Sequence, residues 1–131
     1  MHGVNGSLGW VCCAAVMLVA ILGGCADKSS PAREIAGADP QRGPELMARA
    51  GCAACHRIPG VAWPQGTLGG GLEGFGAKPL IAGRFPNQPA TLIAWLRNAP
   101  ALAPDVAMPP SGLSAQEARD VAAYLYSLDE R

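Results

Sequence analysis

The hydrophobic positions divide the chain into one continuous apolar run near the N-terminus and three later segments with helical periodicity. The continuous run covers residues 11–22. The periodic segments cover residues 39–51, 87–98 and 114–128, where apolar side chains recur at intervals of three and four. The stretches between them are rich in glycine and proline and follow neither a helical nor a strand period. The pattern therefore predicts three helices connected by long loops.

Residues with capping preferences set the expected ends of these helices. Asp39 is a good N-cap, but Pro44 would clash deep in a first turn, so the regular helix is expected to begin around that proline. The middle helix is expected to be capped by Asn87 and to end at residues 99–100. Residues 114–117, Ser-Ala-Gln-Glu, form a capping box for the last helix. The expected apolar faces consist of Leu46, Met47 and Ala50, of Leu92, Ile93, Trp95 and Leu96, and of Ala118, Val121, Ala122, Leu125 and Leu128.

The N-terminal apolar run is typical of an export segment, because its length matches a signal-peptide core and is too short to span a bilayer comfortably. It leads into Leu22-Gly23-Gly24-Cys25, which resembles a bacterial lipobox, so cleavage would leave Cys25 as a lipidated first residue. The alternative is an uncleaved anchor that starts near Leu8, since residues 1–10 contain no lysine or arginine. Both interpretations predict an exported, membrane-anchored domain that faces the periplasm or the outer surface of the cytoplasmic membrane.

The rest of the chain has room for one domain, because the whole sequence has 131 residues. Residues 1–25 are assigned to the export segment. Residues 26–38 are small, polar and proline-containing, and are expected to form a flexible tether with a reach on the order of 20 Å. Residues 39–131 are assigned to the domain.

The composition excludes several classes of protein. Ten basic and ten acidic residues balance, so no basic field indicates nucleic-acid binding. Glycine (17) and proline (12) are abundant while phenylalanine and tyrosine number two each, which predicts a thin core. Only Cys52 and Cys55 of the five cysteines lie in the domain, too close together to join distant segments, so the chain is not a disulfide scaffold.

The string Cys52-Ala53-Ala54-Cys55-His56 is the strongest chemical signal in the chain. In an exported protein it is typical of a c-type haem attachment site, where each thiol forms a thioether and the imidazole faces the iron. The alternatives are half a zinc site and a redox-active dithiol. A structural zinc site needs two further cysteines or histidines, which the domain lacks, and a thioredoxin-like dithiol needs a β-α-β setting. The motif therefore predicts one covalently attached haem c.

Elimination among the remaining side chains that can bind the haem iron favours Met108 as its sixth ligand. His56 is the only histidine of the domain. Met47 lies too close to the attachment motif to reach the opposite haem face, whereas Met108 lies far beyond it and is followed by two prolines that hold the backbone extended. Lys78 remains as another possible donor, and a lone methionine can also be ordinary core packing.

Five motifs occur in order along the domain: Cys52-Ala53-Ala54-Cys55-His56, Leu68-Gly69-Gly70-Gly71-Leu72, Leu92-Ile93-Ala94-Trp95-Leu96-Arg97, Met108-Pro109-Pro110 and Ala122-Ala123-Tyr124-Leu125. Through these motifs the chain resembles, from Asp39 to Leu128, the class I (mitochondrial-type) bacterial cytochromes c. The resemblance implies a small all-α fold of three or more helices, with long loops wrapped around one haem. It also implies thioethers at Cys52 and Cys55, proximal ligation by His56, distal ligation by Met108, and a close approach of the terminal helices at Gly43 and Tyr124.

One position departs from the family pattern. The family usually has Gly-Pro in the haem loop, where the proline carbonyl accepts the proximal imidazole N–H. This chain has Gly70 in place of that proline. A glycine carbonyl can accept the same hydrogen bond, but from a loop that is less pre-organised.

Together with the N-terminal export segment, the resemblance implies a membrane-tethered electron carrier of the respiratory chain rather than an enzyme, with no catalytic residues. Residues 81–108 look especially like small cytochromes and fused haem domains that work with respiratory oxidases, so the electrons are expected to pass towards a terminal oxidase. The expected partners are redox proteins: an oxidase, a quinol–cytochrome c reductase or a dehydrogenase. The alternatives are a haem enzyme or sensor in which Met108 is labile, and a fixed haem subunit of a larger redox complex.

Overall fold

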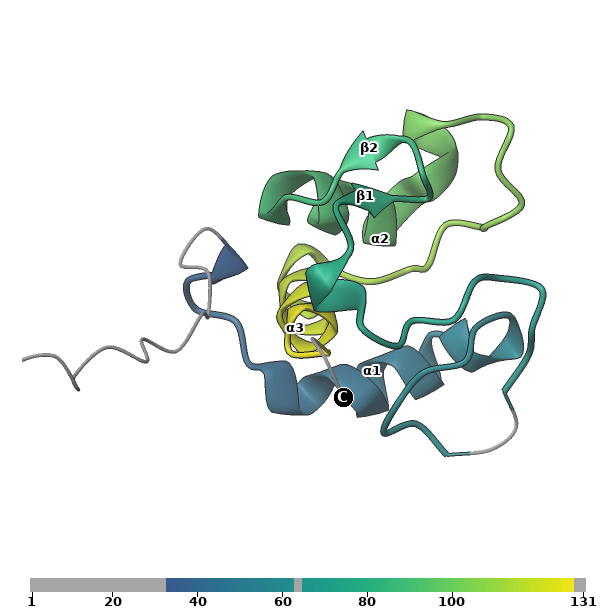
Figure 1. The fold of residues 1–131 in the computed structure, drawn as a ribbon. Helices are drawn as coiled ribbons and strands as arrows, with labels where there is room; N and C mark the ends of the chain where they lie inside the picture. The colour runs from purple at the N-terminus through teal and green to yellow at the C-terminus, as the bar shows by residue number, and fades with distance from the viewer. Residues whose placement is uncertain (1–32, 63–64, 129–131) are drawn as a thin grey trace, which may run out of the picture.

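The computed structural model describes residues 33–62 and 65–128 (Figure 1). The export segment with Cys25, and most of the expected tether, lie outside the described residues. The described residues form three α-helices, α1 (Gly43–Arg49), α2 (Pro89–Leu102) and α3 (Ala115–Tyr126), and a short antiparallel hairpin of β1 (Leu80–Ile81) and β2 (Phe85–Pro86). Turns of 3-10 helix occur at Pro40–Arg42, Cys52–Ala54 and Phe75–Ala77. The prediction of a small, mostly helical domain with long loops is confirmed.

Helix α1 begins where the sequence predicted. The side chain of Asp39 accepts a hydrogen bond from the backbone N–H of Gln41 at 2.9 Å and caps the 3-10 turn before the helix. Regular α-helix starts at Gly43, so Pro44 stands in the first turn, where its missing N–H leaves no hydrogen bond unmade.

Helices α1 and α3 pack against each other at a glycine (Figure 1). A Cβ atom on Gly43 would lie 2.2 Å from Cβ of Tyr124, so only glycine lets the two backbones approach this closely. A buried carboxylate joins α3 to the 3-10 turn that leads into α1. Asp120 on α3 accepts hydrogen bonds from the backbone N–H of Asp39 and from Nη1 of Arg42, both at 2.9 Å. The start of α1 is therefore tied to the middle of α3.

The predicted N-cap of α2 is wrong, whereas the predicted end of its regular helix is confirmed. Gln88, not Asn87, occupies the N-cap position of the helix. Asn87 is only 5% exposed, and its Nδ2 donates to the carbonyls of Phe75 and Lys78 at 3.2 and 2.8 Å, so it joins the preceding turns instead. The regular helix ends where the sequence predicted, since the chain departs from helical geometry at Asn98 (φ −156°, ψ 79°), and one more helical turn to Leu102 follows this kink. The break before Pro100 removes the clash that this proline would cause in a continuous helix.

The last helix matches its prediction. The hydroxyl of Ser114 accepts from the backbone N–H of Glu117 at 3.3 Å, and the carboxylate of Glu117 accepts from the backbone N–H of Ser114 at 2.9 Å. This reciprocal pair is the predicted capping box.

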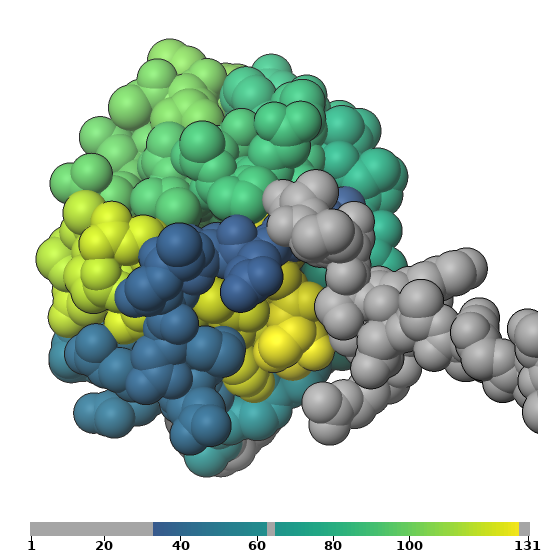
Figure 2. All heavy atoms as spheres, turned by 90° about the vertical axis from the view of Figure 1, so that its left-hand side faces the viewer, coloured from purple at the N-terminus to yellow at the C-terminus, as the bar shows by residue number. Residues whose placement is uncertain are grey.

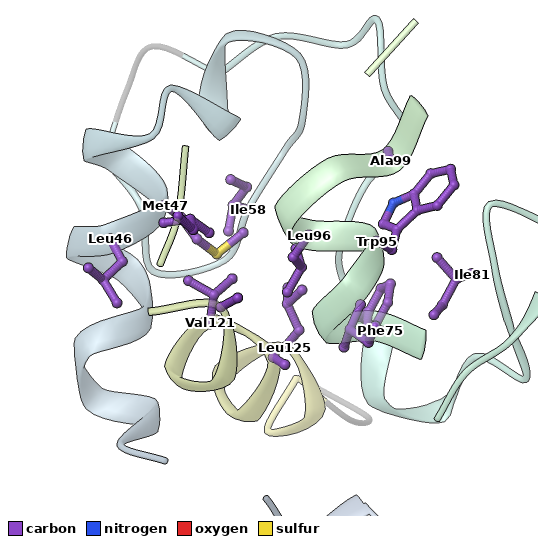
Figure 3. Packing of buried hydrophobic residues seen from close by; sticks show 14 of the residues in the cluster. Leu46, Met47, Ile58, Phe75, Ile81, Trp95, Leu96, Ala99, Val121 and Leu125 are labelled. Atoms are coloured by element: carbon purple, nitrogen blue, oxygen red, sulfur yellow. The ribbon is translucent and has the colours of Figure 1, made fainter. Parts of the chain in front are cut away.

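The expected apolar faces meet in one core (Figure 3). Figure 3 shows Met47 on α1 pointing towards Val121 on α3, and Leu96 on α2 pointing towards Leu125 on α3. Met47 is 1% exposed, so its thioether belongs to the core. The buried hydrophobic residues contributed by the three helices are Leu46, Met47, Leu92, Trp95, Leu96, Ala99, Ala118, Val121, Ala122 and Leu125.

Residues 33–38, which the sequence assigned to the end of the tether, lie against α3. Nε2 of Gln116 donates to the carbonyl of Gly37 at 2.9 Å, and Ile35 packs against the core. The guanidinium of Arg33 lies 5.7 Å from the centre of the Tyr126 ring. In Figure 2 the blue start of the described chain lies directly over the yellow of α3. Within the described ranges, no helix has the length and apolar character needed to cross a membrane.

Candidate haem site

The attachment motif forms a tight turn directly after α1. Gly51 adopts a left-handed conformation (φ 74°), which ends the helix and redirects the chain into the 3-10 turn Cys52–Ala54. The backbone N–H groups of Cys55 and His56 both donate to the carbonyl of Cys52, at 3.2 and 3.0 Å. Both cysteines are free thiols and half-buried. Burial raises the pKa of the Cys52 thiol, so this thiol is neutral at neutral pH.

The imidazole of His56 is oriented by the glycine loop. Its Nδ1 lies 2.7 Å from the carbonyl oxygen of Gly70, so the Nδ1–H donates this hydrogen bond and Nε2 is left as the nitrogen that can bind a metal. The carbonyl of Gly70 therefore accepts the imidazole hydrogen bond for which the family pattern uses a proline carbonyl. A Cβ on the neighbouring Gly69 would lie 2.4 Å from Cε1 of the same ring, so the loop backbone packs directly on the imidazole.

Backbone hydrogen bonds attach the loop to the motif along its length. Gly69 N–H donates to the carbonyl of Cys55 at 2.7 Å, and Leu72 N–H donates to the carbonyl of Arg57 at 2.9 Å. One turn earlier, Gly66 N–H donates to the carbonyl of Ala53 at 2.6 Å. The loop therefore runs alongside the attachment motif, although its glycines have little conformational preference of their own.

Two charged side chains reinforce the loop, and the sequence did not reveal either contact. Nζ of Lys78 donates to the carbonyl of Gly71 at 2.7 Å. Nε of Arg57 donates to the carboxylate of Glu73 at 3.1 Å, so Glu73 is an exposed member of an ion pair rather than an isolated charge. A backbone hydrogen bond and this arginine lower the pKa of Glu73. No pattern in the sequence marks these contacts, because the partners are a backbone carbonyl and a side chain on another turn.

Met108 lies in the connection between α2 and α3, where it is half-buried and packs against the core. Two contacts hold this connection: Ser111 N–H donates to the carbonyl of Arg97 at 3.3 Å, and Nη1 of Arg84 donates to the carboxylate of Asp105 at 2.8 Å. In Figure 1 this connection runs along the right-hand side above, and the loop after His56 along the right-hand side below. Cys52, Cys55 and His56 come together on one turn, and Met108 lies on a separate segment.

The residues of the site fit a c-type haem. Two free thiols stand beside an imidazole whose Nδ1 is hydrogen-bonded and whose Nε2 is left for a metal. An imidazole and a thioether are the axial ligand types of cytochrome c haem iron. The attachment motif with its loop and the connection between α2 and α3 both carry half-buried apolar side chains. A planar apolar cofactor can cover these side chains. They are Cys52 and Leu72 near the motif, and Val106 and Met108 in the connection before α3.

Comparisons with known proteins agree with this fit. The family model described as cytochrome c matches residues 40–129. A chain of the crystal structure of SoxXA from P. pantotrophus is similar, with a TM-score of 0.53 and 27% sequence identity. The match covers 71% of this chain and 83% of the SoxXA chain. A comparison with curated protein sequences finds no match. The chain therefore belongs to the cytochrome c family, whose members bind haem c covalently, and it is a monohaem electron-transfer protein.

Proposed function

We propose that this cytochrome carries single electrons between respiratory-chain components, towards a terminal oxidase, while tethered to the outer face of the cytoplasmic membrane. Membership of the cytochrome c family implies redox protein partners and export to the periplasm. The observation that carries the proposal is the 2.7 Å hydrogen bond between Nδ1 of His56 and the Gly70 carbonyl, because it prepares Nε2 as a metal ligand beside two thiols.

Each site residue has one role in the proposal. Cys52 and Cys55 would hold the haem through two thioethers, Nε2 of His56 would be the proximal ligand of its iron, and the sulfur of Met108 would be the distal ligand. Bound haem supplies a centre that gains and loses one electron. With His56 and Met108 both bound to the iron, no coordination position would be left for a substrate, which favours a carrier over an enzyme.

The position of residues 33–38 on α3 supports a tethered carrier. If Cys25 is lipidated, residues 26–32 alone separate the lipid from the docked segment, a reach on the order of 15 Å for a flexible link. In Figure 1 the docked segment lies on the left, while the loop after His56 and the connection that carries Met108 lie on the right. Anchoring the domain through residues 33–38 would therefore leave the loop after His56 and the connection that carries Met108 accessible to redox partners.

Carbon monoxide binding tests the carrier against the alternative of a haem enzyme or sensor with a labile ligand. The reduced holoprotein, with its haem content verified by a pyridine haemochrome assay, is expected to bind carbon monoxide slowly or not at all at neutral pH. Ready binding would show that the sixth position opens and would contradict the carrier.

Membrane fractionation tests the anchor. Cys25→Ser is expected to release the protein from membranes, since this substitution removes the thiol that carries the lipid. Retention of the variant in the membrane fraction would favour the uncleaved anchor.

A further inference from the structure

The loop that accepts the His56 hydrogen bond contains a run of glycines, which disfavours a single ordered backbone conformation. Gly69, Gly70 and Gly71 are consecutive, and glycine loses more conformational entropy on folding than any other residue. The Gly70 carbonyl must nevertheless stay within hydrogen-bond distance of Nδ1 of His56, where it lies at 2.7 Å. The backbone hydrogen bonds of Gly69 and Leu72 hold the two ends of this stretch, so any restriction of the peptide groups between them has to come from other contacts.

Lys78 is placed to do so. It is the only lysine after residue 28, and its Nζ donates to the carbonyl of Gly71 at 2.7 Å, one peptide group beyond the carbonyl that His56 uses. A hydrogen bond from an ammonium is stronger than one between neutral groups. The lysine is half-buried, so water competes with this contact less than at a fully exposed site.

The backbone of Lys78 is itself held in place. Its N–H donates to the carbonyl of Phe75 at 3.1 Å, and its carbonyl accepts from Nδ2 of Asn87 at 2.8 Å. Asn87 is buried directly before α2. The ammonium therefore connects the glycine loop to a part of the domain that belongs to the core.

We infer that Lys78 is a positioning residue for His56. By holding the Gly71 carbonyl, it restricts the glycine loop so that the adjacent Gly70 carbonyl stays on Nδ1–H, the task that a proline performs in the usual family pattern. The inference rests on the proposed role of His56 as proximal ligand. It assigns to Lys78 a role that differs from that of an iron ligand.

Hydrogen exchange at the imidazole measures this role directly. In the reduced holoprotein with 15N-labelled histidine, NMR reports the exchange rate of the His56 Nδ1–H, and His56 is the only histidine beyond residue 2. Lys78→Met removes the ammonium and keeps the aliphatic stem. It is expected to accelerate exchange by roughly tenfold or more, the equivalent of one lost charged hydrogen bond. Lys78→Arg, which keeps a charged donor, is expected to exchange like the wild type.

A second substitution restores the restriction by another route. A Cβ on Gly70 meets nothing within 4 Å and the residue has no left-handed backbone, so neither observation opposes Gly70→Pro, which restores the residue of the usual family pattern. Added to Lys78→Met, it is expected to return the exchange rate to that of the wild type. Arg119→Gln, which removes a positive charge from α3, is the control and is expected to change nothing.

Three results would overturn the inference: wild-type exchange in Lys78→Met, equal acceleration in Arg119→Gln, or no rescue by Gly70→Pro. If Lys78→Met does not fold, Lys78→Gln is the second variant, with the same expectation, because glutamine is too short to keep the bond. The wild-type protein tests the proposed function separately. It should give a pyridine haemochrome and a His56 imidazole that is protonated at Nδ1 alone, whatever the Lys78 variants show.

Discussion

Gly69 offers the sharpest test of how the loop packs on His56. A Cβ at this position would lie 2.4 Å from Cε1, 2.5 Å from Nδ1 and 2.8 Å from Nε2 of the imidazole, all well inside van der Waals contact. Gly69→Ala therefore forces either the loop or the ring to move. Gly70 is the matched control, because a Cβ on that neighbouring residue meets nothing within 4 Å.

The magnitude follows from two contributions. Inserting a methyl group into a packed contact costs about 1–3 kcal/mol. Moving the ring away from the Gly70 carbonyl also loses a hydrogen bond, which contributes about 1 kcal/mol. Gly69→Ala is therefore expected to lower the free energy of unfolding by about 2–4 kcal/mol. Gly70→Ala is expected to change it by less than about 1 kcal/mol, because neither clash nor backbone strain arises.

Urea unfolding of the two holoproteins, followed by circular dichroism, measures both free energies on the same scale. The loss of the hydrogen bond has its own signature, since the His56 Nδ1–H should exchange faster in Gly69→Ala than in Gly70→Ala. Equal stabilities of the two variants would refute the packing of Gly69 on the imidazole.

Three further substitutions test other parts of the molecule. Met108→Ala is expected to leave haem attached through the cysteines but to lower the reduction potential, since thioether ligation raises it; an unchanged potential in a redox titration would exclude Met108 as the ligand. Hydrogen bonds from Ser114 lower the pKa of Glu117 from 4.5, so the stability it contributes is present above pH 4.5 and is lost as the pH falls through the lower folded-state pKa. Urea unfolding should therefore show Glu117→Gln less stable than the wild type at neutral pH and nearly equal in acid, and a constant difference would contradict this linkage. Tyr124→Phe removes the hydroxyl that donates to the Pro59 carbonyl and should cost about 1 kcal/mol in the same assay; wild-type stability would show that this hydrogen bond contributes nothing net.

Local signals in the sequence predicted the features that depend on neighbouring residues. The capping box at Ser114, the cap at Asp39 and the start of α1 at Gly43 all follow from backbone groups that must be satisfied within one turn. The same reasoning from neighbouring residues wrongly predicted that Asn87 caps α2. An asparagine side chain can cap a helix, or it can be buried and donate to two distant carbonyls, as Asn87 does. The same amide group serves both roles, so only the packing of the folded chain decides between them.

The sequence also predicted where the regular part of α2 ends, but not the helical turn that follows. Proline at position 100 predicts a break, and a break does occur at Asn98. Whether the chain then makes another helical turn depends on the burial of Ala99 and Ala103 in the core, which a local pattern does not contain.

The sequence by itself determined the chemistry of this protein. Five consecutive residues hold both thiols and the imidazole, and the absence of a second histidine in residues 33–128 left Met108 as the favoured sixth ligand. The tertiary structure alone decided how the imidazole is oriented and what holds the glycine loop. Those contacts join His56 to Gly70 and Lys78 to Gly71, and their acceptors are backbone carbonyls. Because every residue carries the same carbonyl, no residue type marks which one is used until the chain has folded.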